Sequence, residues 1–180
     1  MSDSTICVVA LSVKAAEAAT RAKEVTRWLL DGEVIRANAR RDEVRRPSEF
    51  VPGLKADKAT QHAARLKKLA HNGVDIIVGR SPFDPGENFE SVACPKCAAA
   101  ADVDHYLELI GPWLEGPKEP RLKCAKCRSS HLIGDYEGDF AVRVGELAVQ
   151  FNNWGELRAD FLGELKRQLG PRTRVVYQRV

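Results

Sequence analysis

Short apolar runs and amphipathic stretches alternate along this chain. Apolar runs that are rich in β-branched residues and bounded by polar sequence predict buried strands. Such runs occupy residues 6–13, 74–78 and 174–180. Two more strands are predicted at 140–144 and 147–151, the second from a clean alternation of apolar and polar positions.

Apolar residues at helical spacing predict four helices. The predicted helices cover residues 14–30, 57–71, 103–114 and 156–169. The first places Ala18, Ala22, Val25 and Trp28/Leu29 on one face, and Asp31-Gly32 is typical of a helix end. The stretch 37–53 is charged, contains two prolines and has no period, so it is predicted to be a long surface loop.

The order of these elements predicts an α+β fold. Residues 1–80 form a first strand–helix–helix–strand half, and residues 140–180 form a second half that ends in a strand. Two split βαβ halves of this kind can share one sheet covered by helices, in a ferredoxin-like arrangement. Residues 81–139 are then a module inserted between the halves.

Four of the five cysteines form two CxxC pairs inside the inserted segment. Cys94 and Cys97 form the first pair, and Cys124 and Cys127 form the second, with 26 residues between them. Each CxxC turn places two thiolates on one side of a metal ion, and two such turns complete a tetrahedral shell. The pairs therefore predict one structural Zn²⁺ per chain. The fifth, Cys7, falls in the first predicted strand and is expected to be a small buried residue.

The segment around these cysteines, about residues 92–135, resembles the zinc-ribbon class of modules, in which two CxxC knuckles hold one metal ion. The predicted helix at 103–114 departs from the simplest ribbon. The resemblance implies a structural metal. It does not choose among nucleic-acid binding, protein docking and stabilisation, because all three occur in that class.

The charge balance is close to neutral. The chain carries 28 basic and 25 acidic residues, for a net charge of +3, which does not by itself indicate a nucleic-acid partner. No apolar run reaches the roughly 20 residues of a membrane helix. The apolar run at 6–13 is not preceded by basic residues, so it is expected to be a strand and not a secretory signal. Paired CxxC motifs without such a signal are typical of a reducing compartment, so a cytoplasmic location is expected.

Basic residues surround the cysteines and allow two interpretations. Lys96, Lys123, Lys126 and Arg128 are candidates for contact with phosphates. They also offset the negative charge of a zinc tetrathiolate. The second interpretation is favoured because four carboxylates lie close in sequence, at Glu119, Asp135, Glu137 and Asp139.

The densest basic run lies in the predicted loop and is the best sequence candidate for a partner contact. It comprises Arg40, Arg41, Arg45 and Arg46, with Phe50 as an aromatic residue in an otherwise polar stretch. Long loops in compact domains often carry function. Asp42, Glu43 and Glu49 balance the run in part, so an ordinary solvated loop remains the alternative.

Signatures of common enzymes are absent from the sequence. There is no GxxxxGK[ST], GxGxxG after a strand, HExxH or GxSxG. A catalytic site would need Asp135, Asp139 and His131 to come together in space. The turn Asn152-Asn153-Trp154 is a weaker candidate for recognition, since asparagine side chains commonly bond to their own backbone in turns.

The order of motifs in the whole chain resembles that of small uncharacterised bacterial proteins. The matching pieces are Cys94 to Cys97, Cys124 to Cys127, Phe151 to Leu157 and Leu169 to Val180. The leading hypothesis is a non-enzymatic, zinc-stapled protein that binds another protein, with an immunity or antitoxin protein as one version. The alternative is a zinc-ribbon protein that binds nucleic acid. The sequence does not fix the oligomeric state.

Overall fold

A computed structural model describes the chain except for residues 1–3, 40–47, 67–68, 70 and 180. Six strands form one antiparallel sheet in the order β2-β3-β4-β7-β1-β8. The strands are β1 (Ser4–Ala10), β2 (Ile35–Ala37), β3 (Phe50–Pro52), β4 (Gly73–Phe83), β7 (Arg143–Asn152) and β8 (Thr173–Arg179).

The four strands β4-β7-β1-β8 have the ferredoxin-like topology that the sequence predicts. Helix α1 (Ala15–Asp31) connects β1 to β4, and β7 lies between those two strands. Helix α5 (Ala159–Leu169) connects β7 to β8, and β1 lies between them. Each half is thus a split βαβ unit, and β2 and β3 extend the sheet beyond β4.

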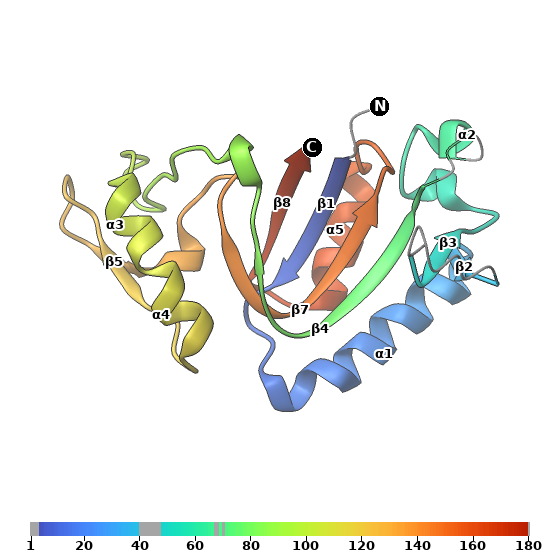
Figure 1. Cartoon of the computed structure of the whole chain (residues 1–180), viewed down its shortest axis with the longest axis horizontal. Helices are drawn as coiled ribbons and strands as arrows, with labels where there is room; N and C mark the ends of the chain where they lie inside the picture. Colours follow the sequence, from blue (N-terminus) through green and yellow to red (C-terminus); the bar gives the residue numbers. More distant parts are fainter. Residues whose placement is uncertain (1–3, 40–47, 67–68, 70, 180) are drawn as a thin grey trace.

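Both long helices cover one face of the sheet, where the main core lies (Figure 1). Alternate residues of the central strands point into this core, among them Val8 of β1 and Phe151 of β7. Of the residues predicted from its spacing, helix α1 buries Ala18, Ala22, Val25 and Leu29, whereas Trp28 is partly buried. The apolar periodicity of the sequence therefore reports the buried face of this helix correctly.

A smaller apolar cluster lies on the opposite face of the sheet. It contains Cys7, Val9, Phe83, Ala148 and Val176. The register of β4 against β7 shifts between Val78 and Ser81, and Gly79 between them has a φ of 108°. Both strands bend strongly (Figure 1). Burial raises the pKa of the Cys7 thiol to about 12, which agrees with its predicted role as a small buried residue.

Two predicted helices are wrong in extent. Where the structure describes the range 57–71, it shows the 3₁₀ turn η1 (Ala56–Lys58) and the short helix α2 (Ala63–Leu66) in place of one helix. Thr60 interrupts them because its buried hydroxyl donates to the carbonyl of Trp154 and its backbone bridges to Leu157.

The helix predicted at 103–114 is divided into α3 (Val103–Glu108) and α4 (Ile110–Glu115). Pro112 explains the break, because it lacks an N–H and its ring clashes with the carbonyl four residues earlier.

Strand boundaries also differ from the prediction. The two strands expected at 140–144 and 147–151 are one strand, β7, and β4 continues to Phe83 instead of ending at 78. The predicted loop 37–53 contains β3 and the end of β2.

The segment between β4 and β7, residues 84–142, is called the cysteine module below. Besides α3 and α4 it contains η2 (Gly86–Asn88), β5 (Arg121–Lys123), β6 (Ser130–Leu132) and η3 (Ile133–Asp135). It lies beside the sheet, at the end away from β2 and β3 (Figure 1). It has its own buried cluster around Tyr106, Trp113 and Tyr136. Within the part of the chain that the structure describes, no helix has the length and apolar character needed to cross a membrane.

Candidate metal centre

The two CxxC turns adopt the same local geometry. Ala98 donates its backbone N–H to the carbonyl of Cys94 at 2.9 Å, and Arg128 donates to Cys124 at the same distance. Ala98 and Arg128 both have left-handed backbones, with φ of 54° and 60°. The same hydrogen bond and the same left-handed residue thus occur in both CxxC turns. This geometry brings the two thiols of each turn to the same side of the turn.

The four sulfur atoms fit a tetrahedral metal ion. The Sγ atoms of Cys94, Cys97, Cys124 and Cys127 all lie within 4.8 Å of one another. The Cys94–Cys127 separation is 3.8 Å and the Cys97–Cys124 separation is 3.6 Å. Four ligands about 2.3 Å from a tetrahedral zinc would be about 3.8 Å apart. A disulfide requires about 2.05 Å, so these separations do not fit disulfides and are compatible with a bound metal ion.

The centre is embedded in the core of the module. Cys94 and Cys124 are buried, whereas Cys97 and Cys127 are half-buried. Tyr136 is fully buried next to them and donates its hydroxyl to the carbonyl of Leu122. Burial, followed by the negative charges of the four thiolates, raises the pKa of Tyr136 to about 12. The tyrosine therefore stays neutral beside the site.

Ser129 lies directly outside the sulfur shell, a residue that the sequence analysis did not single out. Its hydroxyl is 2.8 Å from the Sγ of Cys127 and 2.8 Å from Nε2 of His131. The hydrogen bond from Ser129 is the largest cause of the low pKa of Cys127, about 6. His131 thus contacts the shell through Ser129. Outer groups of this kind orient the ligands of a metal site.

This donor set has the chemistry of a structural site. Four thiolates complete the coordination of Zn²⁺ and leave no position for water or substrate. When bound, zinc would fasten β5 and the Cys94 turn to each other without taking part in a reaction.

Buried and half-buried arginines attach the cysteine module to the sheet. Arg143, at the start of β7, is fully buried and donates to the Tyr106 hydroxyl and to the carbonyls of Tyr136 and Gly138, at 2.7–3.0 Å. Arg80 of β4 donates to the carbonyl of Leu114. No local sequence pattern marks these contacts, because each arginine lies in an ordinary strand pattern.

Arg172, just before β8, makes a third attachment. Its guanidinium contacts both carboxylate oxygens of Glu119 at 2.8 and 2.9 Å, and Asp135 at 2.8 Å. All three side chains are less than one-third exposed. Two of the four carboxylates that the sequence placed near the knuckles are thus held by this arginine.

The four basic knuckle residues, Lys96, Lys123, Lys126 and Arg128, are all exposed. Glu137 and Asp139 are also exposed, so the surface of the module still carries both signs of charge.

The structure describes only part of the predicted partner-contact loop. Arg40, Arg41, Arg45 and Arg46 lie outside the described residues. Phe50 belongs to β3 and is 7% exposed in the main core. Its ring is therefore a core element, and its position gives no support to a contact role.

The other polar candidates have structural partners. Asp135 is ion-paired with Arg172, and the cysteines are the one group of metal-ligand type within 4.8 Å of one another among the described residues. A cluster of Asp135, Asp139 and His131 is therefore not formed. Trp154 is buried against Phe151, and the Asn153 backbone N–H donates to the carbonyl of Ser4, so this turn closes the end of the sheet.

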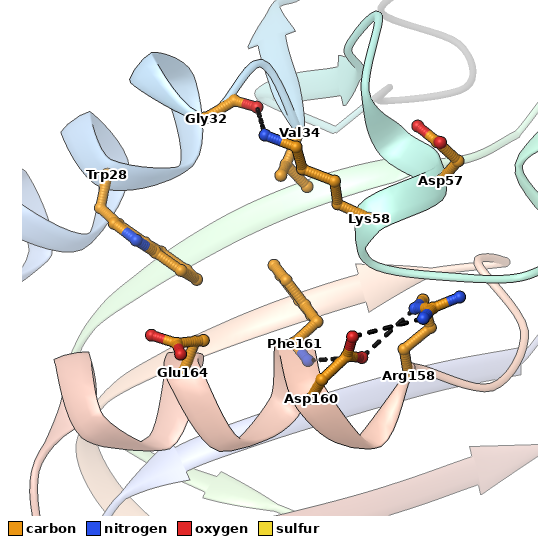
Figure 2. A pocket seen from close by; sticks show the side chains of 9 residues that line it. All are labelled: Trp28, Gly32, Val34, Asp57, Lys58, Arg158, Asp160, Phe161 and Glu164. Atoms are coloured by element: carbon orange, nitrogen blue, oxygen red, sulfur yellow. Dashed lines mark hydrogen bonds and ion pairs between the residues drawn. The ribbon is translucent and has the colours of Figure 1, made fainter.

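A pocket of about 550 Å³ lies between the end of α1, η1 and the start of α5 (Figure 2). The rings of Trp28 and Phe161 stack in this pocket, with their centroids 5.6 Å apart. Three charged groups on its rim have local partners: Arg158 pairs with Asp160, and Lys58 donates to the carbonyl of Gly32 (Figure 2). Helical spacing placed Trp28 on the inward face of its helix, but it did not predict the pocket.

Comparisons of the chain with models of protein families, with curated proteins and with solved structures find no match.

Proposed function

We propose that this chain is a non-catalytic, zinc-stapled binding protein that acts by contact with another protein. The observation that carries this proposal is the four-thiolate shell, which is complete and walled by the core of the module. A complete shell supports a structural role for the metal, since a catalytic zinc keeps one position open. An immunity or antitoxin protein is one version of such a role.

Exposed apolar side chains support a protein contact over a purely structural role. Among the described residues, five large hydrophobic side chains are more than one-third exposed: Leu30, Leu54, Val78, Val103 and Leu107. Val103 and Leu107 are one turn apart on α3 and so share a face. Grouped apolar exposure marks interaction sites more often than scattered exposure does.

Nucleic-acid binding is the second candidate, and the ion pairs of Arg172 favour it. Arg172 holds Glu119 and Asp135, so these carboxylates do not face the exposed knuckle cations as free charges. Lys96, Lys126 and Arg128 lie in or directly after the two metal-binding turns. Such a surface would contact phosphates without reading bases.

One experiment separates the two candidates. The tagged, zinc-loaded chain is purified from its native host, and the eluate is divided into nuclease-treated and untreated halves. A protein partner that survives nuclease supports the proposal. Partners that vanish together with bound RNA or DNA overturn it in favour of the second candidate.

Salt dependence gives an independent test of the second candidate. Each phosphate contact that is lost should reduce the slope of log affinity against log salt by about 0.9 on duplex DNA. A variant with Glu at Lys96, Lys123, Lys126 and Arg128 is compared with a control variant of equal charge change on other exposed residues, at Arg36, Lys55, Arg65 and Arg167. Equal slopes for both variants would exclude a specific role of the knuckles.

A further inference from the structure

The two CxxC turns have equivalent backbones but carry different side chains next to the sulfur atoms. Cys94 donates its backbone N–H to the carbonyl of Ala99 at 2.8 Å, and Cys124 donates in the same way to Ser129 at 2.9 Å. The eight residues that begin at each of these cysteines have the same order of buried, half-buried and exposed positions. Ser129 therefore occupies the position in the second turn that Ala99 occupies in the first.

This exchange changes the surroundings of the outer cysteine of each turn. Cys97 and Cys127 are both half-buried. The sulfur of Cys127 accepts hydrogen bonds from the hydroxyl and from the backbone N–H of Ser129. The sulfur of Cys97 accepts from the backbone N–H of Ala99, whose methyl group replaces the serine hydroxyl. The two sulfurs thus share a degree of exposure but differ in the donors that reach them.

His131 sets the direction of the hydrogen bonds at Ser129. A zinc-bound sulfur is a thiolate without a proton, so the Ser129 hydroxyl donates to Cys127 across their separation of 2.8 Å. Because the hydroxyl has a single proton, the 2.8 Å contact with His131 requires that Nε2 of the histidine carries a proton and donates to Ser129. Ala101 takes the place of His131 in the first turn. Cys127 therefore ends a chain of two side-chain donors that has no counterpart at Cys97.

We propose that Cys97 is the modification site of the centre, the thiolate that reacts first with a small oxidant such as hydrogen peroxide, and that Ser129 protects Cys127 from the same reaction. A donor to a thiolate engages the sulfur lone pairs that attack an oxidant, so it lowers the nucleophilicity of that sulfur. Cys94 and Cys124 are buried and less accessible. This inference goes beyond the proposed function, because it concerns the metal centre and not the partner contact.

The reaction is a two-electron oxidation of one sulfur. A lone pair of the Cys97 thiolate attacks one oxygen of hydrogen peroxide, an S–O bond forms and the O–O bond breaks. The sulfur is oxidised to a sulfenic acid, and the second peroxide oxygen leaves as hydroxide, which takes a proton from the solvent to become water. A sulfenic acid is no longer a thiolate ligand, so Zn²⁺ keeps three thiolates and dissociates more readily.

The test uses the full-length, zinc-loaded protein, a limiting amount of hydrogen peroxide, and dimedone, which traps sulfenic acids for identification by mass spectrometry. The dimedone adduct should lie on Cys97 about tenfold more often than on Cys127, since a hydrogen bond to a charged group has an effect of about that size. A zinc-sensitive dye should report metal release that rises together with the adduct.

Two variants exchange the side chains of the turns, and neither introduces a residue that the equivalent turn lacks. Ser129→Ala should raise the modification of Cys127 to the level of Cys97. Ala99→Ser should lower the modification of Cys97. The control is Ser130→Ala, which removes an exposed hydroxyl that bonds to a neighbouring arginine, and it should leave both cysteines unchanged.

Three results would overturn this inference. Equal or preferential trapping on Cys127 in the unaltered chain would mean that Ser129 does not protect that sulfur. Trapping that is the same in Ser129→Ala and in the unaltered chain would separate the hydroxyl from the reactivity. An effect of Ser130→Ala as large as that of Ser129→Ala would make the change unspecific. Each of these results leaves the proposed protein contact to its own test, the nuclease-resistant partner.

Discussion

The sheet-and-helix core and the cysteine module are stabilised in different ways. Counted over the residues that the structure describes, the core buries 24 hydrophobic residues in one cluster between the sheet and helices α1 and α5. The module contributes nine residues to its own cluster, two of which are cysteines of the candidate centre, and its helices and strands are at most six residues long. Short elements of this kind do not hold together without additional links.

Those links are the cysteine centre and the arginines. The centre joins two turns that are 26 residues apart, and Arg143, Arg172 and Arg80 join the module to the strands. The core should thus fold on apolar burial alone, whereas the module should depend on metal. Each prediction below tests that difference.

The largest effect is expected for Cys124→Ser. Structural zinc contributes on the order of 10 kcal/mol to the folding of small zinc modules, which is comparable to the entire stability of a domain. The module should lose its metal and its fold, while the core keeps a cooperative transition. Metal content together with circular dichroism checks this. A variant that retains one tightly held zinc and a native module would contradict the four-thiolate assignment.

The second largest loss of stability is expected for Arg143→Met. Its replacement by Met leaves the Tyr106 hydroxyl and the carbonyls of Tyr136 and Gly138 without their buried donor. The cost should be about 3 kcal/mol in the free energy of unfolding of the module. Arg167→Met on exposed α5 surface is the matched control and should change stability by less than about 0.5 kcal/mol. Denaturant unfolding measures both, and equal effects would show that Arg143 is not an attachment.

The core and the cysteine module also differ in which of their features the sequence predicts. The apolar run at 6–13, the α1 face and the second βαβ half report burial directly, and they were enough to predict the topology of the sheet. The CxxC pairs report metal chemistry directly, and they were enough to predict the sulfur shell. Thr60 and Arg143 act through contacts 94 and 37 residues away in the chain, and no local pattern marks such contacts.

An effect that is absent at neutral pH should appear in alkali. The pKa of Cys7 is raised to about 12, above the value of 9.0 for an unburied thiol, so the unfolded chain loses this proton first. The stabilisation from keeping Cys7 neutral is complete below pH 9 and is lost as the pH rises from 9 to 12, by at most about 1.4 kcal/mol per pH unit. Denaturant unfolding of the unaltered chain and of Cys7→Ala over this range checks it. Parallel curves for the two proteins would contradict the burial of this thiol.

The smallest effect is expected at Arg128. Its left-handed backbone costs about 1 kcal/mol for a residue with a Cβ, and glycine removes that cost but loses more chain entropy on folding. Arg128→Gly should therefore change the melting temperature by only a few degrees. Arg128→Val should lower it more, because a branched side chain fits this conformation least well. A larger loss for glycine than for valine would contradict the turn geometry.

The most direct measurement of the central claim is hydrogen exchange by mass spectrometry, with and without a zinc chelator. The account predicts that residues 92–136 lose protection when the metal is removed, while β1, β7 and α5 keep theirs. Unchanged protection in residues 92–136, with the metal demonstrably removed, would contradict the claim that the ion holds the module together. Simultaneous loss of protection in β1 and β7 would contradict the independence of the core.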